Sequence, residues 1–170
     1  MQRVLVIGCP GAGKSTLAEK LAKRTGLPLI HLDRLYWSRG WRPAETSARR
    51  RQVSEIVTAP AWIIDGNYPG TFDIRLPRAD TLIWLDYSRA RCLRRLIWRM
   101  LRHHGRARPE LPDGCDERLD FVLLRQVWEF PAVHRDRIAQ AIEQFGAHAR
   151  MVRFRHDRDA NAFLAGMGAM

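Results

Sequence analysis

A short segment near the N-terminus combines glycines, a lysine and a serine at a spacing suited to binding phosphate. Residues 8 to 15 read Gly-Cys-Pro-Gly-Ala-Gly-Lys-Ser, which fits G-x-x-x-x-G-K-[ST]. In this pattern backbone N–H groups bind phosphate oxygens, the lysine reaches the terminal phosphates and the serine hydroxyl binds Mg²⁺. The residues expected to bind nucleotide are Gly8, Pro10, Gly11, Ala12, Gly13, Lys14, Ser15 and the adjacent Thr16. Lys14 is also expected to act in catalysis.

The residues on either side of this motif predict the structure that such a loop requires. Residues 3 to 7 are Arg-Val-Leu-Val-Ile, a β-branched, apolar run typical of a parallel strand buried on both faces. Residues 15 to 23 place leucines and alanines at helical spacing, and Gly26 gives a stop signal. Strand, glycine loop and helix together favour a true phosphate-binding loop.

Further apolar runs predict more strands of the same sheet. They cover residues 28–32, 61–64, 80–85 and 150–154, with helical stretches between them. This alternation indicates an α/β fold in which helices cover both faces of a parallel sheet.

Three aspartates follow predicted strands, at the sheet edge where ligands bind. Asp65 ends the apolar run Trp-Ile-Ile and is expected to support the metal together with Ser15. Asp33 follows the second strand and is predicted to be a general base or orienting acceptor for the attacking hydroxyl, with a turn or cap as the alternative. Asp86 and Ser88 are better explained as caps of the next helix.

An arginine-rich stretch follows the fourth strand. Residues 89 to 108 contain eight arginines and no acidic residue, on a predicted amphipathic helix, and a Gly-, Pro- and Arg-rich loop comes next. We expect residues 103–118 to form a lid whose arginines neutralise charge during phosphoryl transfer. The candidates are Arg99, Arg102, Arg106, Arg108 and Arg118. A solvated basic face, or a nucleic-acid surface with base stacking on Trp98, are the alternatives.

Length and composition agree with one cytoplasmic domain. The chain has 170 residues, is 46% hydrophobic and has a net charge of +11. We expect a single domain over residues 1–170, with no membrane span or signal peptide. Three cysteines match neither a disulfide framework nor a zinc site, as expected in a reducing compartment. The charge by itself identifies no partner.

With these motifs in place, the chain resembles the adenylate kinase-like P-loop kinases. The stretches Leu-Ile-His-Leu-Asp-Arg-Leu-Tyr-Trp, Trp-Ile-Ile-Asp-Gly-Asn-Tyr and Asp-Gly-Cys-Asp-Glu-Arg are most similar to the bacterial proteins labelled DNA topology modulation proteins. The resemblance implies the P-loop NTPase fold, with a five-stranded parallel sheet of order 2-3-1-4-5 and a lid. It also implies ATP and Mg²⁺, and Arg99 and Arg155 are counted among the nucleotide contacts.

The acceptor side departs from true adenylate kinases, which carry phosphate-binding arginines after the second and third strands. Here residues 31–36 and 65–69 have no arginine at the matching positions. An aspartate after the second strand is closer to shikimate-type and other small-hydroxyl kinases. The residues predicted to contact the acceptor are Asp33, Arg34, Asn67, Tyr68, Arg75 and Arg118.

Two functions remain open on the sequence. The first is an ATP- and Mg²⁺-dependent kinase of a small molecule or nucleotide. The second is a nucleic-acid-associated module that binds ATP with weak or no transfer, which the basic stretch 89–108 motivates.

Overall fold

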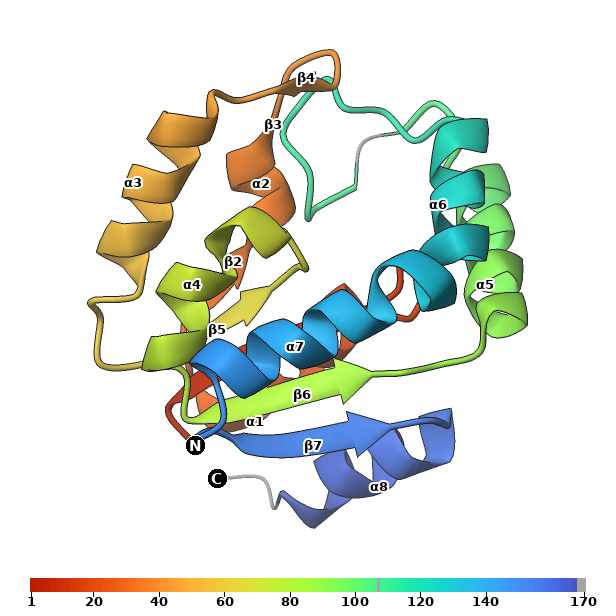
Figure 1. Ribbon diagram of the computed structural model, residues 1–170. Helices are drawn as coiled ribbons and strands as arrows, with labels where there is room; N and C mark the ends of the chain where they lie inside the picture. The colour runs from red at the N-terminus through yellow and green to blue at the C-terminus, as the bar shows by residue number, and fades with distance from the viewer. Residues whose placement is uncertain (107, 168–170) are drawn as a thin grey trace.

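Five parallel strands form the centre of the protein, as Figure 1 shows for this computed structural model, which describes residues 1–106 and 108–167. Strands β1, β5 and β6 are almost wholly buried, because helices cover both faces of the sheet. The strands are β1 (Arg3–Gly8), β2 (Leu29–His31), β5 (Trp62–Asp65), β6 (Thr81–Leu85) and β7 (Arg150–Phe154). The α/β prediction and the five-stranded parallel sheet are confirmed.

The strand order is β2-β5-β1-β6-β7. Its numbering differs from the predicted 2-3-1-4-5 because the structure contains two further strands, β3 (Trp37–Ser38) and β4 (Arg42–Pro43). These pair antiparallel in a separate hairpin. Sequence reasoning missed them because two-residue strands leave no periodic pattern.

Helices lie on both sides of the sheet and beyond its edges (Figure 1). Helix α7 crosses the front of the sheet and α1 lies behind it, while α5 and α6 pack side by side at the right. The helices are α1 (Lys14–Thr25), α2 (Leu32–Tyr36), α3 (Thr46–Ile56), α4 (Phe72–Arg75), α5 (Arg89–Arg102), α6 (Phe121–Val133), α7 (Arg135–Phe145) and α8 (Asp157–Gly166). Two 3₁₀ turns, η1 (Pro69–Thr71) and η2 (Leu76–Arg78), flank α4.

Strand register brings the predicted chemistry to one edge of the sheet. Asp65 pairs with Val6 of β1 on one side and with His31 of β2 on the other. The glycine loop leaves β1 two residues after Val6, and α2 begins one residue after His31. The carboxyl ends of three neighbouring strands therefore meet at one place.

The segment between α5 and α6 contains the predicted lid, and α6 begins at Phe121. Asp120 caps it by accepting a hydrogen bond from the N–H of Leu123, at 3.0 Å. Residue 107 of the expected lid lies outside the described residues. We call residues 103–118 the α5–α6 segment.

The predicted cap at Asp86 is also corrected. Asp86 accepts hydrogen bonds from Arg135 of α7, at 2.5 Å, and from Nε of Arg153 of β7, at 2.9 Å. Ser88 occupies the N-cap position of α5 without a side-chain cap hydrogen bond. Asp86 thus joins the sheet edge to α7 rather than capping α5.

Among the described residues, no helix combines the length and the apolar character needed to cross a bilayer.

Candidate active site

The glycines of the loop allow two close backbone approaches. Gly8 and Gly11 have φ values of 149° and 80°. A Cβ on Gly8 would lie 2.5 Å from the Leu85 carbonyl oxygen, and one on Gly11 would lie 2.4 Å from that of Cys92. Any side chain at either position would displace the loop from β6 or α5. The loop is thereby fixed between these two elements, with Gly13 at the N-cap of α1.

Two cationic side chains contact carbonyl groups of this loop. Lys14 Nζ donates to the Cys9 carbonyl at 3.3 Å. Arg95 on α5 donates to the Ala12 carbonyl at 3.2 Å and to Asp157 at 2.7 Å. Arg95 was not among the predicted site residues, although it lies one helical turn before Arg99 on the same predicted face. Both side chains bring positive charge to a loop suited to phosphate.

Asn67 supports the loop from the end of β5. Its carboxamide accepts a hydrogen bond from Gly8 N–H at 2.9 Å and donates one to the Gly8 carbonyl at 2.8 Å. One carboxamide oxygen and one N–H are therefore used on the backbone of the loop. Asn67 therefore holds the loop, and because it also lines the cavity, its predicted contact with the acceptor stays a prediction.

Arg75 is likewise placed differently from the prediction. Its side chain is fully buried and does not line the cavity. Its guanidinium donates to the Gly66 carbonyl at 3.0 Å, to Thr71 Oγ1 at 2.9 Å and to the carbonyls of Asn67 and Tyr68. All these acceptors belong to the chain that follows β5. Arg75 therefore shapes that turn and is not free to bind an acceptor.

Asp65 is buried, with one carboxylate oxygen paired and one unpaired. Oδ2 lies 3.1 Å from Nδ1 of His31, whereas Oδ1 is buried without a hydrogen-bond partner. Burial lowers the pKa of His31, but the hydrogen bond and charge of Asp65 outweigh it, so the pKa lies above its usual 6.5. A buried, unpaired carboxylate oxygen beside the loop fits a cation or its bound water.

Asp33 lies in the first turn of α2 and accepts a hydrogen bond from the Tyr68 hydroxyl. Burial, followed by the charge and hydrogen bond of Asp33, raises the pKa of Tyr68 far above its usual value. Tyr68 therefore remains a neutral donor that fixes one Asp33 oxygen. Its φ of 35° is an unusual conformation for a tyrosine, which the hydrogen bonds from Arg75 to this turn support.

One cavity of about 1240 Å³ connects the loop to these carboxylates. It has room for a nucleotide and a second small molecule. The predicted site residues that line it are Pro10, Gly11, Ala12, Gly13, Lys14, Ser15, Thr16, Asp33, Asp65, Asn67, Tyr68, Arg99, Arg108 and Arg118.

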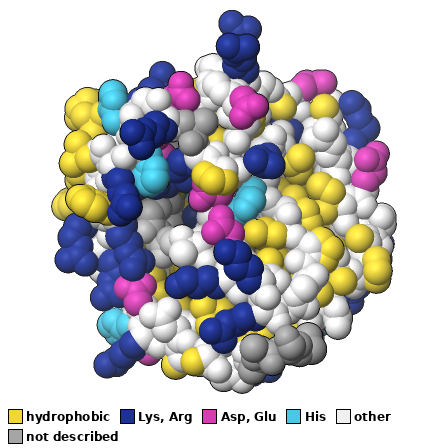
Figure 2. Space-filling model, turned by 180° about the vertical axis from the view of Figure 1, so that it is seen from behind, with side chains coloured by type: hydrophobic (Ala, Val, Ile, Leu, Met, Phe, Trp, Pro, Cys, Tyr) yellow, Lys and Arg dark blue, Asp and Glu magenta, His cyan; other side chains and the backbone are white. Residues whose placement is uncertain are grey.

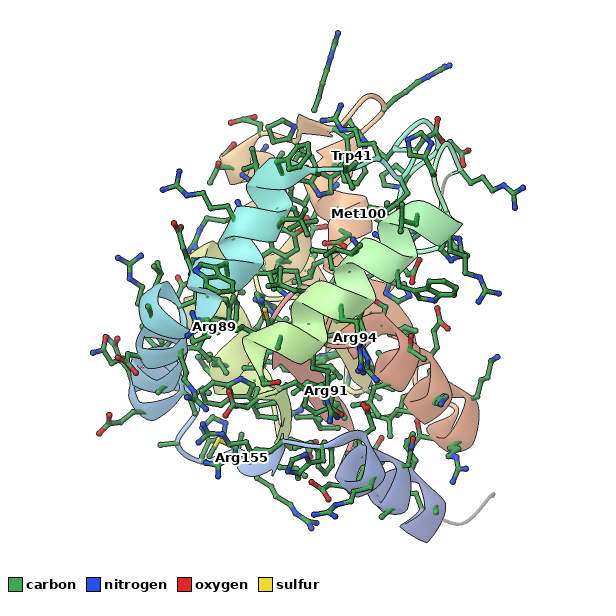
Figure 3. The ribbon with its side chains drawn as sticks, turned by 90° about the vertical axis from the view of Figure 1, so that its right-hand side faces the viewer. Trp41, Arg89, Arg91, Arg94, Met100 and Arg155 are labelled. Carbon is green, nitrogen blue, oxygen red and sulfur yellow. The ribbon has the colours of Figure 1, made fainter. Side chains whose placement is uncertain are left out.

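Other predicted residues lie elsewhere. Gly8 is buried beneath the loop, while Arg34, Arg102, Arg106 and Arg155 are exposed and do not line the cavity. Figure 3 shows Arg155 near α8, at the end of the view opposite Trp41. Arg102 ends α5 and Arg106 follows it, so neither side chain lies with Arg99 at the cavity wall.

Two arginines of the cavity are held by one buried glutamate. Glu117 Oε2 lies 2.6 Å from Arg108 Nε and 3.2 Å from Arg99 Nε, in ion pairs whose angles fall outside hydrogen-bond geometry. A further hydrogen bond of 3.2 Å joins Arg99 Nη2 to Oε1. Burial and the nearby charge of Arg108 lower the pKa of Arg99, an effect that Glu117 opposes. Sequence reasoning did not single out Glu117.

The α5–α6 segment also contacts the β3–β4 hairpin. Gly40 N–H donates to the Gly114 carbonyl at 3.0 Å, and the indole N–H of Trp41 donates to the Asp116 carbonyl at 3.1 Å. The thiol of the buried Cys115 lies 3.2 Å from the Ser38 carbonyl, to which it donates. Figure 3 shows Trp41 above the Met100 end of α5. The hairpin and the segment together close one side of the cavity.

The arrangement supplies the parts that phosphoryl transfer requires. It combines loop amides and cations for phosphate, a carboxylate for a hydroxyl proton and a buried carboxylate oxygen for a cation. Among the described residues, no cluster of three or more His, Cys, Asp or Glu side chains could hold a metal by itself.

Comparisons with known proteins establish the fold. A shikimate kinase from Bacteroides thetaiotaomicron is 20% identical with a TM-score of 0.53, over 98% of this chain and 96% of that one. A sugar kinase from a Janibacter species is 16% identical with a TM-score of 0.54, over 97% and 93%. No protein-family model matches the chain, and no curated protein matches it. The fold is that of the P-loop kinases.

Proposed function

We propose that the protein is a kinase that uses ATP and Mg²⁺ to phosphorylate a small molecule or nucleotide. The observation that carries this proposal is the single cavity that contains the phosphate loop, Asp33, Asp65 and the pair Arg99 and Arg108. The kinase fold and the resemblance of the motifs to P-loop kinases also support it. The sequence likeness to DNA topology modulation proteins adds a label but no chemistry.

In this proposal each part of the loop has a distinct task. The backbone N–H groups of residues 11–14 bind phosphate oxygens, aided by the N-terminus of α1. The Lys14 ammonium leaves the Cys9 carbonyl for the terminal phosphates. Ser15 and the unpaired oxygen of Asp65 hold Mg²⁺ directly or through water. Bound there, Mg²⁺ neutralises phosphate charge and orients the transferred group.

The remaining residues act on the acceptor and on the charge of the transferred group. The Asp33 oxygen not used by Tyr68 accepts the hydrogen of the attacking hydroxyl. Arg99 and Arg108 exchange their contacts with Glu117 for contacts with phosphate oxygens. The α5–α6 segment serves as the lid and excludes water from the cavity.

The first test is calorimetric titration of the protein with ATP and Mg²⁺. We expect binding that is lost or strongly weakened in Lys14→Ala, with Lys23→Ala, at the other end of α1, as the matched control. A screen of hydroxyl compounds and nucleoside monophosphates for ADP release then tests transfer. Unchanged ATP affinity in a folded Lys14→Ala protein would overturn the proposal.

A second function is supported by the outer face of α5. Trp98 is 61% exposed, and Arg94 and Arg102 are exposed on the same helix. Lys and Arg side chains gather on the corresponding side of the molecule in Figure 2. This face fits a nucleic-acid surface with phosphate contacts and base stacking. Binding to single-stranded DNA that falls steeply with salt would support it, whereas no binding at moderate salt excludes it.

A further inference from the structure

Four aromatic rings form a continuous wall along the acceptor side of the cavity. The Tyr68 and Tyr36 ring centroids are 4.6 Å apart, Tyr36 and Trp37 are 4.6 Å apart, and Trp37 and Trp41 are 5.4 Å apart. All four residues line the cavity, and none of the four is fully buried. Adjacent rings are tilted by 31° to 73°, so the wall offers apolar ring faces and edges against which a bound ring can pack.

Arg49 of α3 lies against this wall with unused binding capacity. Its guanidinium carbon is 4.2 Å from the centre of the Tyr36 ring, and Arg49 lines the cavity. Nε is buried without a hydrogen-bond partner, and Nη2 donates only to the Thr46 hydroxyl, at 2.7 Å. No carboxylate of the described residues forms an ion pair with it. A buried, unsatisfied guanidinium donor in a cavity wall is suited to an anion of the ligand.

The neighbouring Arg50 shows the contrast. It also lines the cavity, but its guanidinium binds both oxygens of Asp73, at 2.7 and 3.1 Å, and the Gly70 carbonyl. The charge of Arg50 is therefore already used within the protein. Of the two α3 arginines that line the cavity, Arg49 is the one without a carboxylate partner among the described residues.

A negative charge adjoins the first ring of the wall, Tyr68. The Tyr68 hydroxyl binds Asp33, and the next ring, Tyr36, contacts both Tyr68 and Arg49, so Asp33 and Arg49 adjoin neighbouring rings of the wall. A carboxylate at the transfer end repels a phosphate monoester but accepts a hydrogen bond from an alcohol. The reacting group at Asp33 is then a neutral hydroxyl, and an anionic group of the same molecule belongs at Arg49.

We propose that the acceptor is a small alcohol that carries a ring and, apart from the reacting hydroxyl, a carboxylate or phosphate bound by Arg49. This proposal rests on the proposed kinase function. The hydroxyl oxygen forms a bond to the γ-phosphorus of ATP while the bond from that phosphorus to the β–γ bridging oxygen breaks. The hydroxyl proton passes to Asp33, and ADP leaves.

The test uses a panel of hydroxymethyl-substituted aromatic rings, each prepared as a carboxylate, a phosphate ester and a neutral carboxamide, with AMP as a comparison. Binding is followed by quenching of tryptophan fluorescence, because Trp37 and Trp41 lie in the wall, and transfer is followed by ADP release. We expect the best anionic compound to bind at least about tenfold more tightly than its carboxamide, and the carboxylate and phosphate arms to identify the anion.

Three variants make the role of Arg49 specific. Arg49→Gln should remove the preference for anionic compounds, Arg49→Lys should keep part of it, and Arg51→Gln, an exposed neighbour on α3, should leave it intact. ATP affinity should not change in any of them, and thermal unfolding checks that each is folded. Equal binding of anionic and neutral compounds, preference for AMP, or no effect of Arg49→Gln would overturn the proposal. Anion-selective binding without ADP release would instead contradict the kinase function but support an anion-binding site at Arg49.

Discussion

Asn67 binds both backbone polar groups of Gly8, with its carboxamide oxygen 2.9 Å from the N–H nitrogen and its amide nitrogen 2.8 Å from the carbonyl oxygen. Gly8 ends β1, and Asn67 follows the adjacent strand β5. The first residue of the phosphate loop is thus fixed to the strand that carries Asp65. This side chain is one of the contacts that fix the position of the loop, together with the close approaches of Gly8 to β6 and Gly11 to α5.

Replacing Asn67 with leucine should therefore weaken both folding and nucleotide binding. The N–H and carbonyl of Gly8 would lose their partners in a largely buried place, which costs about 1–3 kcal/mol. Chemical denaturation measures the free energy of unfolding, and calorimetry measures the ATP affinity. Gln52→Leu, on the exposed face of α3, is the control and should change neither quantity. An Asn67→Leu protein with wild-type affinity would show that the loop needs no support from β5.

Replacing Asp33 or Asp65 with asparagine should affect different steps, namely phosphoryl transfer for Asp33 and nucleotide binding for Asp65. Asp65→Asn should weaken Mg²⁺-dependent nucleotide binding whichever acceptor is present. Asp33→Asn should leave ATP affinity within a few fold and lower transfer by roughly 10²- to 10⁴-fold, with the lower end favoured because a loose transition state needs little base assistance.

The two measurements on each folded variant are nucleotide affinity and the rate of transfer. Tyr68→Phe is a matched third variant, since it removes the hydrogen bond to Asp33 but leaves the carboxylate. If Asp33→Asn transfers phosphate at the wild-type rate, Asp33 has no role in catalysis and only forms part of the first turn of α2.

Glu117→Gln should destabilise the protein, because Arg99 would lose its buried countercharge and Arg108 would keep only Glu110, at 3.7 Å. Breaking a buried ion pair from one side costs about 3–5 kcal/mol, and glutamine retains part of the hydrogen bonding, so we expect a loss near 2–4 kcal/mol. The free energy of unfolding from urea titration measures it. Glu129→Gln breaks the exposed pair with Arg125 and should have no measurable effect. Addition of ATP should restore part of the lost stability, because phosphate would replace the missing negative charge.

The ion pairs of Asp86 should make the free energy of unfolding decrease at acid pH. Burial raises the pKa of Asp86, but Arg135 and Arg153 outweigh it and hold the pKa below 3.8. A depressed pKa stabilises the folded state above the unfolded pKa, and this contribution is lost as the pH falls through the folded value. The free energy of unfolding should therefore differ between wild type and Asp86→Asn at about pH 5 to 7. The difference should shrink below pH 3.8. A difference independent of pH would mean that packing, not charge, is lost.

Parts of the site could be predicted because they follow from chain order alone. Strand ends of a parallel sheet lie at one edge, so Asp33 and Asp65 could be assigned to it, and the glycine pattern located the loop. Which carbonyls Asn67 and Arg75 would meet could not be predicted, because those acceptors are positioned only when the turn after β5 folds against β1. Polar residues after a strand can bind either a ligand or the backbone, and both kinds of residue show the same sequence pattern.

The arginines show a similar limit. Helical periodicity grouped the arginines of α5, but α5 ends at Arg102, so Arg102 and Arg106 do not share the cavity with Arg99. Arg49 was missed because Tyr36, which ends α2, meets it only when α2 packs against α3.

The hydrogen bonds between the β3–β4 hairpin and the α5–α6 segment have a kinetic consequence for the proposed kinase. The hairpin belongs to the acceptor side of the cavity and the segment carries Arg108, so separating the two would open both halves of the site in one event. Phosphorylated product and ADP would then share one exit. If that opening were the slow step, turnover would not depend on the reactivity of the acceptor hydroxyl, and Trp41→Phe, which removes the hydrogen bond to Asp116, would speed turnover at the expense of wasted ATP hydrolysis.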